Sequence, residues 1–427
     1  MAIERTGEYH RPVQRACKQA GFDTRLVHPL TTKQFRMAAD PANKTDDTDL
    51  AAVFRAAVNG FGLLEPALPE DYLQLQLLIR HRRDLVAKTM TLCCQIRELL
   101  HALMPGYAEC FSDLWEHRLA LPLARVCPPA EVLRQEGGQT LLRVLAEHKL
   151  SSRRDSFAKI LNWAETAPAT PPQHEFLQQF LVTLDKDRLS KNQQILSLEG
   201  RIVPYLTRTP YVLLLAIPGI NVVSAADLAV EAGPISLYPN ANAITGRAGL
   251  VPARYQSDQV DRANGPLRRR ANRRLRTALM QIADNLVACN HHYQAKATSW
   301  ARKGKDARWI RVKVAKNFNR LLYAMVAGRQ LFPHPCRQED HYVLHKLMEF
   351  HRLHGSPMPQ HLADLDAATL QLPPSAYAAE AMPLKERLKE VLNRKGPQPL
   401  ADILTIVLAR LGCLPVQSEM SEVSGPG

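Results

Sequence analysis

The spacing of apolar and polar positions changes three times along the chain and divides it into four parts. In residues 1–65, strand-like and helix-like segments alternate, which predicts an α/β unit. The predicted segments are a strand stub at 2–4, a helix over 9–20 and a strand over 24–28. Thr45 or Asp46 is placed to cap a further helix that opens with an acidic run.

Residues 66–207 are predicted to be mostly helical. Leucine recurs every seven residues at positions 78, 85, 92 and 99, and a helical arm or short coiled coil fits this repeat. A looser apolar pattern over 176–206, including Leu189, Leu196 and Val203, predicts a returning partner helix. The repeat is equally consistent with an ordinary bundle core and with an intermolecular zipper. The stretch between the two helices gives weak signals.

Residues 208–332 are predicted to form a compact helical module, and residues 333–427 a peripheral tail with a helix over 383–394. The module opens with two short helices around Gly219. Such a hairpin can aim backbone N–H groups at a phosphate, or it can serve only as a turn between packed helices. Asn221 follows in this turn, and asparagine tolerates the left-handed conformation.

Composition narrows the class of protein. The 427 residues are 46% hydrophobic, enough for a sizeable core and two to four domains. A formal net charge of +14 favours a polyanionic partner, above all nucleic acid. Eight cysteines without a CxxC pair favour a reducing compartment over a disulfide framework. Without a membrane-length apolar run or a signal peptide, the sequence predicts a soluble, cytoplasmic, nucleoid-associated protein with no membrane partner.

The positive charge is concentrated around one serine. Ser257 lies in the segment 249–262, and the arginine-rich run 266–276 follows at once. Guanidinium groups at this density are typical of a surface that binds phosphodiesters, although solvated helix faces also carry such charge. The candidate contacts to a nucleic-acid backbone are Arg254, Arg269, Arg270, Arg273 and Arg276. A second basic stretch over 302–316 extends the predicted surface.

Three carboxylates are candidates for a metal site. Glu4 ends the first strand stub, and Asp46 and Asp49 share one face of the first turn of a helix. Oxygen ligands from a strand end and a neighbouring helix suit Mg²⁺ (or Mn²⁺), which can polarise a phosphodiester. Acidic residues in a first turn also serve as caps and stabilise the helix dipole, so the spacing alone leaves both interpretations open.

Two sets of motifs resemble one family, the insertion-sequence transposases with a DEDD, RuvC-like domain and a serine-bearing C-terminal transposase domain. The set that resembles the DEDD domain is Glu4-Arg-Thr6-Gly7-Glu-Tyr9-His-Arg11-Pro12, Gly21-Phe22, Val27-His-Pro29 and Lys44-Thr45-Asp46 through Asp49. The set that resembles the C-terminal domain is Ile217-Pro-Gly-Ile220, Gly249-Leu-Val-Pro252, Tyr255-Gln-Ser257, Arg269-Arg270-Ala-Asn272 and Leu275-Arg276. The matched regions cover somewhat under half of the chain.

The resemblance implies an α/β plus all-α protein. Its parts would be an incomplete RNase H/RuvC-like domain over 1–65, a coiled-coil-like arm over 66–207 and a helical transposase domain over 208–332. By resemblance, Glu4, Asp46 and Asp49 are three acids of the metal cluster and Ser257 is the nucleophile. Members of this family look like recombinases guided by a structured bridge RNA, in which dimers assemble into a tetramer on donor and target DNA.

The chain departs from the family's pattern in three places. The family's first acid lies on a strand that would precede Met1, so we expect either a start codon assigned too far downstream or a decayed copy. Three acids should bind Mg²⁺ poorly, and the sheet should keep an unpaired edge and an uncovered apolar face. Asp258 and Ala271 stand where the family usually has glycine.

Three functions remain open at this point. The first is a metal-dependent DNA recombinase with a serine nucleophile. The second is a remnant that binds nucleic acid without chemistry, and its binding would survive loss of Glu4 or Ser257. The third is a branched-DNA nuclease that uses water and leaves Ser257 idle. A covalent protein–DNA adduct distinguishes the first from the third.

Overall fold

The structure is a computed structural model that describes residues 1–7, 9–63, 68–252, 255–257, 260–262, 265–268, 271–331 and 342–373. Only the backbone is described for 255–257, 260–262 and Tyr342. The chain divides into two units, Met1–Pro69 and Glu70–Gly427. The helix predicted over 383–394 lies outside the described residues. Among those described, none of the helices has the length and apolar character needed to cross a membrane.

The first unit contains a parallel pair of strands. β1 (Ala2–Glu4) runs beside β2 (Arg25–Val27), with Ile3 opposite Leu26. Helix α1 (His10–Gln19) makes the crossover between them, since parallel neighbours need a long connection. The predicted alternation of strand and helix is confirmed. Both α1 and β2 are two residues shorter than the apolar pattern indicated.

Two further helices complete this unit. α3 (Asp46–Val58) packs against both strands, and α2 (Pro29–Ala39) packs against α3. Thr45 caps α3, as predicted. Its Oγ1 accepts a hydrogen bond from the Thr48 N–H at 3.2 Å, and the Thr48 Oγ1 accepts one from the Thr45 N–H at 3.0 Å. Val27, Val53 and Ala56 form the small buried core.

One side of α3 is apolar and exposed. Leu50, Phe54 and Val58 follow one another at four-residue spacing and are 69%, 68% and 70% exposed. This face lies on a helix, whereas the uncovered apolar face was expected on the sheet, where Leu26 and Val27 of β2 are buried. Two strands in the described part establish a mixed α/β unit, while the finer RNase H/RuvC-like topology stays a prediction.

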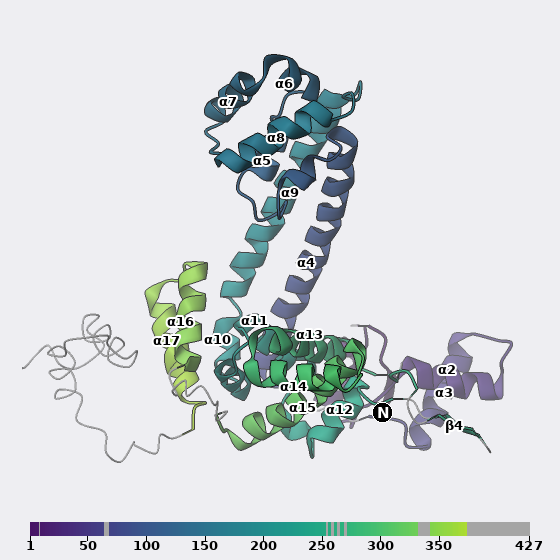
Figure 1. Cartoon of the computed structure of the whole chain (residues 1–427). Coiled ribbons are helices and arrows are strands. Elements are labelled where there is room, and N and C mark those ends of the chain that lie inside the picture. Colours follow the sequence, from purple (N-terminus) through teal and green to yellow (C-terminus); the bar gives the residue numbers. More distant parts are fainter. Residues whose placement is uncertain are drawn as a thin grey trace, which may run out of the picture. The chain divides into compact units, whose positions relative to one another are not determined.

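Two long helices form the arm of the second unit. α4 (Glu70–Leu103) and α9 (His174–Gly200) pack along each other (Figure 1). Leu78 and Leu85 of the predicted repeat are buried. The returning helix is thus a segment of the same chain, as the second apolar pattern predicted.

The contact residues predicted on α9 are wrong. Leu189 and Leu196 are 43% and 50% exposed, whereas Leu181 is fully buried. The apolar spacing gave the wrong contact face because a charged side chain occupies a core position on this helix. Asp185 is fully buried and forms ion pairs. Its partners are Arg188 on the same helix, with Nε 2.7 Å from Oδ1, and Arg125, whose Nε lies 2.6 Å from Oδ2.

The segment with weak sequence signals folds as a helical cap at one end of the arm (Figure 1). Its elements are η1 (Tyr107–Cys110), α5 (Ala120–Ala124), α6 (Ala130–Glu136), α7 (Gly138–Glu147) and α8 (Arg154–Thr166). Their buried side chains share one core with Ile96 and Leu103 of α4 and with Leu181 of α9. Helices this short, separated by proline and glycine, leave too few turns for a periodic signal.

The C-terminal module is helical apart from one pair of short strands in its described part. Its elements up to residue 328 are α10 (Val203–Leu206), η2 (Pro210–Ala216), α11 (Val222–Ala232), η3 (Ile235–Leu237), α12 (Ala241–Ala248), β3 (Tyr255–Ser257), β4 (Val260–Arg262), α13 (Arg273–Cys289), α14 (His291–Arg302) and α15 (Ala307–Gly328). α13 and α15 pack together at its centre, where Leu279, Phe318 and Leu322 are fully buried.

Ion pairs join the module to the arm. Arg83 of α4 lies 2.6 Å from Asp227 and 2.5 Å from Glu231, both on α11. Within the arm, Arg82 of α4 lies 2.5 Å from Glu199 of α9. Burial raises the pKa of Asp227, while Arg83 opposes the rise. Each of these contacts joins side chains from segments far apart in the sequence. Helical periodicity therefore does not predict them.

Part of the predicted tail belongs to the module. α16 (Tyr342–His354) packs on η2 and on α9, and α17 (Met358–Thr369) packs on α10 and α16. Val343, Leu344 and Leu347 are buried. The stretch 342–373 is therefore not peripheral, because these three side chains lie in the core.

Candidate functional site

Ser257 is the last residue of a short strand. β3 and β4 pair antiparallel, with Tyr255 opposite Arg262 and Ser257 opposite Val260. The strand pair emerges from the segment between α12 and α13. At the base of that segment, Pro252 bridges Leu267, and the Arg268 N–H donates to the Val251 carbonyl at 3.1 Å.

Arg276 holds the base of this segment. Its Nε donates to the Ala248 carbonyl at 2.8 Å, and its Nη2 donates to the Gly249 carbonyl at 3.2 Å and to the Arg268 carbonyl. The side chain is half-buried. The arginine-rich run predicted a phosphate contact for Arg276, but the structure places its guanidinium on backbone carbonyls of its own chain.

The other predicted arginines divide into two groups. Arg273 is exposed in the first turn of α13, and the Asn272 side chain caps that helix by accepting from the Leu275 N–H at 3.0 Å. Arg254, Arg269 and Arg270 lie outside the described residues. Arg273 is thus the predicted contact whose position suits a phosphate.

The turn between α14 and α15 combines lysine with tryptophan. Trp309 is 40% exposed and meets Trp300 edge-on at a centroid distance of 5.7 Å. The ammonium groups of Lys305 and Lys313 lie 5.5 and 5.7 Å from the Trp309 ring centre. Asp306 caps α15, where it accepts from the Trp309 N–H at 2.6 Å. Cations beside an exposed aromatic ring are typical of a nucleic-acid surface.

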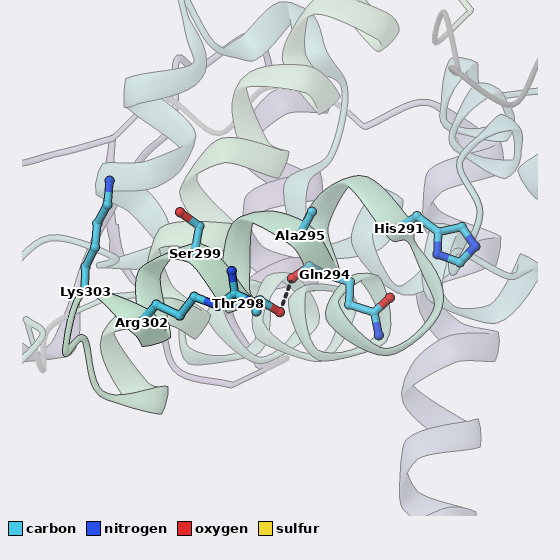
Figure 2. A pocket seen from close by; sticks show the side chains of 7 residues that line it. All are labelled: His291, Gln294, Ala295, Thr298, Ser299, Arg302 and Lys303. Carbon is cyan, nitrogen blue, oxygen red and sulfur yellow. Dashed lines mark hydrogen bonds between the residues drawn. The ribbon is translucent and has the colours of Figure 1, made fainter.

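An open hollow follows one face of α14 (Figure 2). Its lining residues are His291, Gln294, Ala295, Thr298, Ser299, Arg302 and Lys303. The Thr298 hydroxyl donates to the Gln294 carbonyl at 2.9 Å, as the dashed line in Figure 2 marks. This lining carries cations and hydroxyls without a carboxylate, which suits a polyanion better than a metal ion.

The three candidate acids lie on packed elements of the first unit. Glu4 ends β1, which α3 contacts, and Asp46 is exposed in the first turn of α3. Asp49 is ion-paired instead: its Oδ1 lies 2.8 Å from Nε of Arg36 on α2. Within the described residues, no group of three or more His, Cys, Asp or Glu side chains could hold a metal ion. As placed, these acids do not form the predicted Mg²⁺ site, and Asp49 is ion-paired with Arg36 instead.

The turn at Gly219 is a packing element. A Cβ at Gly219 would lie 3.2 Å from the Asn285 carbonyl oxygen of α13. Lys346 of α16 donates to the Ile217 and Ile220 carbonyls at 2.9 and 2.7 Å, and Asn290 donates to the Pro218 carbonyl at 3.2 Å. Of the two interpretations, the turn between packed helices is the one observed.

A left-handed conformation was expected to be tolerable at Asn221, but the residue does not adopt it. Asn221 is extended, with φ −107°, and not left-handed. Its side chain accepts from the Ser224 N–H at 2.8 Å and caps α11. The contact of Lys346 with this turn was not predicted, since one lysine on an amphipathic helix carries no signal of burial.

Two family models match the chain, one over the first unit and α4 and the other within the second unit. A model for the DEDD domain of IS110 transposases matches residues 1–105, and a model described as the transposase IS116/IS110/IS902 family matches residues 211–299. The second match includes β3, β4 and all of α13. Both matches are to models of this transposase family. The resemblance seen in the motifs is thereby confirmed.

Relatives from insertion elements are similar over larger parts of the chain. The 44.8 kDa protein of insertion element IS116 from Streptomyces clavuligerus is 27% identical over 49% of this chain and 52% of its own length. The 43.6 kDa protein of IS110 from Streptomyces coelicolor is 24% identical over 66% of this chain and 70% of its own length. A probable family 20 transposase of Pseudomonas aeruginosa is 23% identical over 77% of this chain and 83% of its own length. The chain thus spans about half the length of the IS116 relative.

Proposed function

We propose that the chain is a DNA transposase that cuts and rejoins DNA through Ser257. The observation that carries the proposal is the presence, in one chain and in the family's order, of matches to the DEDD domain and to the transposase domain. The exposed Arg273 and the lysine–tryptophan turn support a nucleic-acid partner. A structured guide RNA and assembly from dimer to tetramer belong to the proposal by resemblance alone.

The proposed chemistry is a pair of transesterifications. The Ser257 oxygen attacks a DNA phosphorus, a phosphoserine ester forms, and the O3′ atom leaves as a hydroxyl after taking up the proton that the serine loses. A 3′-hydroxyl of a second strand then attacks the phosphoserine and returns the proton to Ser257. Each step breaks one phosphate ester and forms another, so no nucleotide hydrolysis is needed. A serine hydroxyl needs activation, and nearby cationic groups stabilise the charge on the phosphate.

The role of the acids is a separate part of the proposal. The DEDD match suggests a requirement for a divalent ion. In this structure Asp49 forms an ion pair with Arg36. Glu4, Asp46 and Asp49 would serve together as metal ligands only after that ion pair breaks. When bound, such an ion would polarise the phosphate ester.

A cleavage assay tests the proposal. The full chain is incubated, with and without EDTA, with radiolabelled DNA that spans the junctions on either side of its coding sequence. We expect strand cleavage and a labelled species that migrates with the protein under denaturing conditions. Ser257→Ala should abolish both, whereas Ser197→Ala, at an exposed serine on α9, should change neither. Cleavage without a protein-linked species would instead favour a nuclease that uses water. Binding without cleavage would favour the inactive remnant.

A further inference from the structure

We propose that Arg276 is a positioning residue: it fixes the base of the strand pair that ends at Ser257 and does not contact the nucleic acid. This inference rests on the proposed role of Ser257. It concerns a different step, namely how the serine is held and not what it attacks.

The guanidinium joins two stretches of backbone that flank the strand pair. The Ala248 and Gly249 carbonyls close α12, before β3, and the Arg268 carbonyl follows β4. A guanidinium offers several N–H donors in a fixed plane, so one side chain can hold carbonyls from both stretches at once. Nε and Nη2 of this half-buried side chain donate to carbonyls of its own chain.

Backbone hydrogen bonds tie the same two stretches. The Asn272 N–H donates to the Arg247 carbonyl at 2.8 Å, and the Arg268 N–H donates to the Val251 carbonyl at 3.1 Å. Loss of the Arg276 side chain would leave these bonds in place. The segment would then stay attached, but three carbonyls would lose the donor that sets their direction.

Gly249 makes room for the guanidinium. Its φ is +63°, and a Cβ there would lie 2.3 Å from Nη2 of Arg276 and 2.4 Å from Cβ of Ala271. Gly249, Ala271 and Arg276 therefore form one close contact. We call these three residues the stem clamp.

The strand pair depends on such a clamp because it is short. β3 and β4 share three residue pairs, and an isolated two-stranded ladder of this length is marginal in water. Because the ladder is this short, we expect a change at its base to shift its last pair, Ser257 and Val260. The stem clamp thus acts on the backbone position of Ser257, and we expect its loss to lower the reaction rate rather than the affinity.

Arg276→Gln tests this role against Arg273→Gln, its match on the exposed face one turn earlier. Four quantities are measured on the full chain: the melting temperature, amide hydrogen exchange of β3 and β4, DNA affinity as a function of salt, and the rate of adduct formation at saturating DNA. For Arg276→Gln we expect DNA affinity within twofold of wild type and an unchanged salt slope. Exchange in β3 and β4 should be at least tenfold faster, and adduct formation at least tenfold slower. For Arg273→Gln we expect weaker binding and a salt slope lower by about one, with unchanged exchange.

Other outcomes overturn the inference. A lower salt slope with unchanged exchange in Arg276→Gln would make Arg276 a phosphate contact. A lower melting temperature with an unchanged adduct rate in the folded fraction would make it a structural residue only. If the Gln variant does not fold, Arg276→Lys takes its place, and an unchanged exchange and adduct rate there contradict the proposal. Failure of the serine mechanism is recognised separately: the wild type would then cleave DNA without an adduct, or an adduct would persist in Ser257→Ala. Hydrogen exchange tests the clamp in either case.

Discussion

At the scale of single residues, Gly249 has the most constrained environment in the candidate site. We predict that Gly249→Ala lowers the free energy of unfolding by about 1–3 kcal/mol, since alanine is strained at a positive φ and its methyl group would clash with Arg276 and Ala271. Gly246→Ala in α12 is the matched control. A Cβ there meets nothing within 4 Å, so helix propensity should make that variant more stable by about 0.5–1 kcal/mol. Urea denaturation measures both, and equal effects would refute the packing around Gly249.

Lys346 gives the protein a pH dependence of known sign. Burial lowers its pKa from 10.5 to about 8, with Glu349 opposing the shift. Between those pH values the unfolded chain keeps a proton that the folded chain has lost, so this group raises the free energy of unfolding as pH increases, by at most about 1.4 kcal/mol per pH unit. The free energy of unfolding of the wild type, measured by urea denaturation relative to that of Lys346→Met, should therefore increase from pH 8 to 9.5. Parallel profiles would show that Lys346 does not titrate in this range.

The sequence predicts single residues only where a local pattern identifies them. Thr45 was found as a cap because a small polar residue before an acidic, then apolar, run marks a helix start. Arg276 was assigned to phosphate because its neighbours in the sequence are also arginines. What distinguishes it is contact with Ala248 and Gly249, more than twenty-five residues earlier. A contact at such separation leaves no mark on the local sequence.

At the scale of elements, the arm depends on a buried charge. Asp185 is fully buried between Arg125 and Arg188. We predict that Asp185→Ala lowers the free energy of unfolding by about 3 kcal/mol, because it leaves Arg188 buried without its anion. Asp187→Ala, at an exposed position on the same helix, should cost less than about 0.5 kcal/mol. Chemical denaturation compares the two, and similar values would contradict the buried ion pair.

Helix α16 provides a second test at this scale. Leu347 is fully buried and Leu353 is 76% exposed on the same helix. If α16 belongs to the core of the module, Leu347→Ala should cost about 2–4 kcal/mol and Leu353→Ala less than about 0.5 kcal/mol. Thermal and urea unfolding measure the difference. A small effect of Leu347→Ala would restore the interpretation of this stretch as a peripheral tail.

Elements were predictable where periodicity was long. The heptad spacing from Leu78 to Leu99 identified α4, and the α/β alternation identified β1, α1 and β2. The cap was missed because its helices are short, and the contact face of α9 was missed because Asp185, and not Leu189, points inward. Apolar spacing locates a helix more reliably than it locates the face the helix buries.

At the scale of the whole molecule, family membership was the most predictable property. Motifs around Glu4 and around Ser257 indicated it, and the two family matches confirmed it. The predicted three-acid Mg²⁺ site was not found in the described residues, where Asp49 forms an ion pair with Arg36. Sequence motifs identify the residue types that a reaction uses. Which of these side chains form ion pairs with other residues depends on the folded chain.

The central claim is that Ser257 carries the DNA during recombination. The most direct measurement is mass spectrometry of the tryptic peptide containing residue 257 after incubation of the full chain with DNA from its own flanking junctions, followed by nuclease digestion. The account predicts a nucleotide phosphate on Ser257 in the wild type and none in Ser257→Ala. Cleaved DNA with an unmodified Ser257 peptide, under conditions that trap the intermediate, would contradict it.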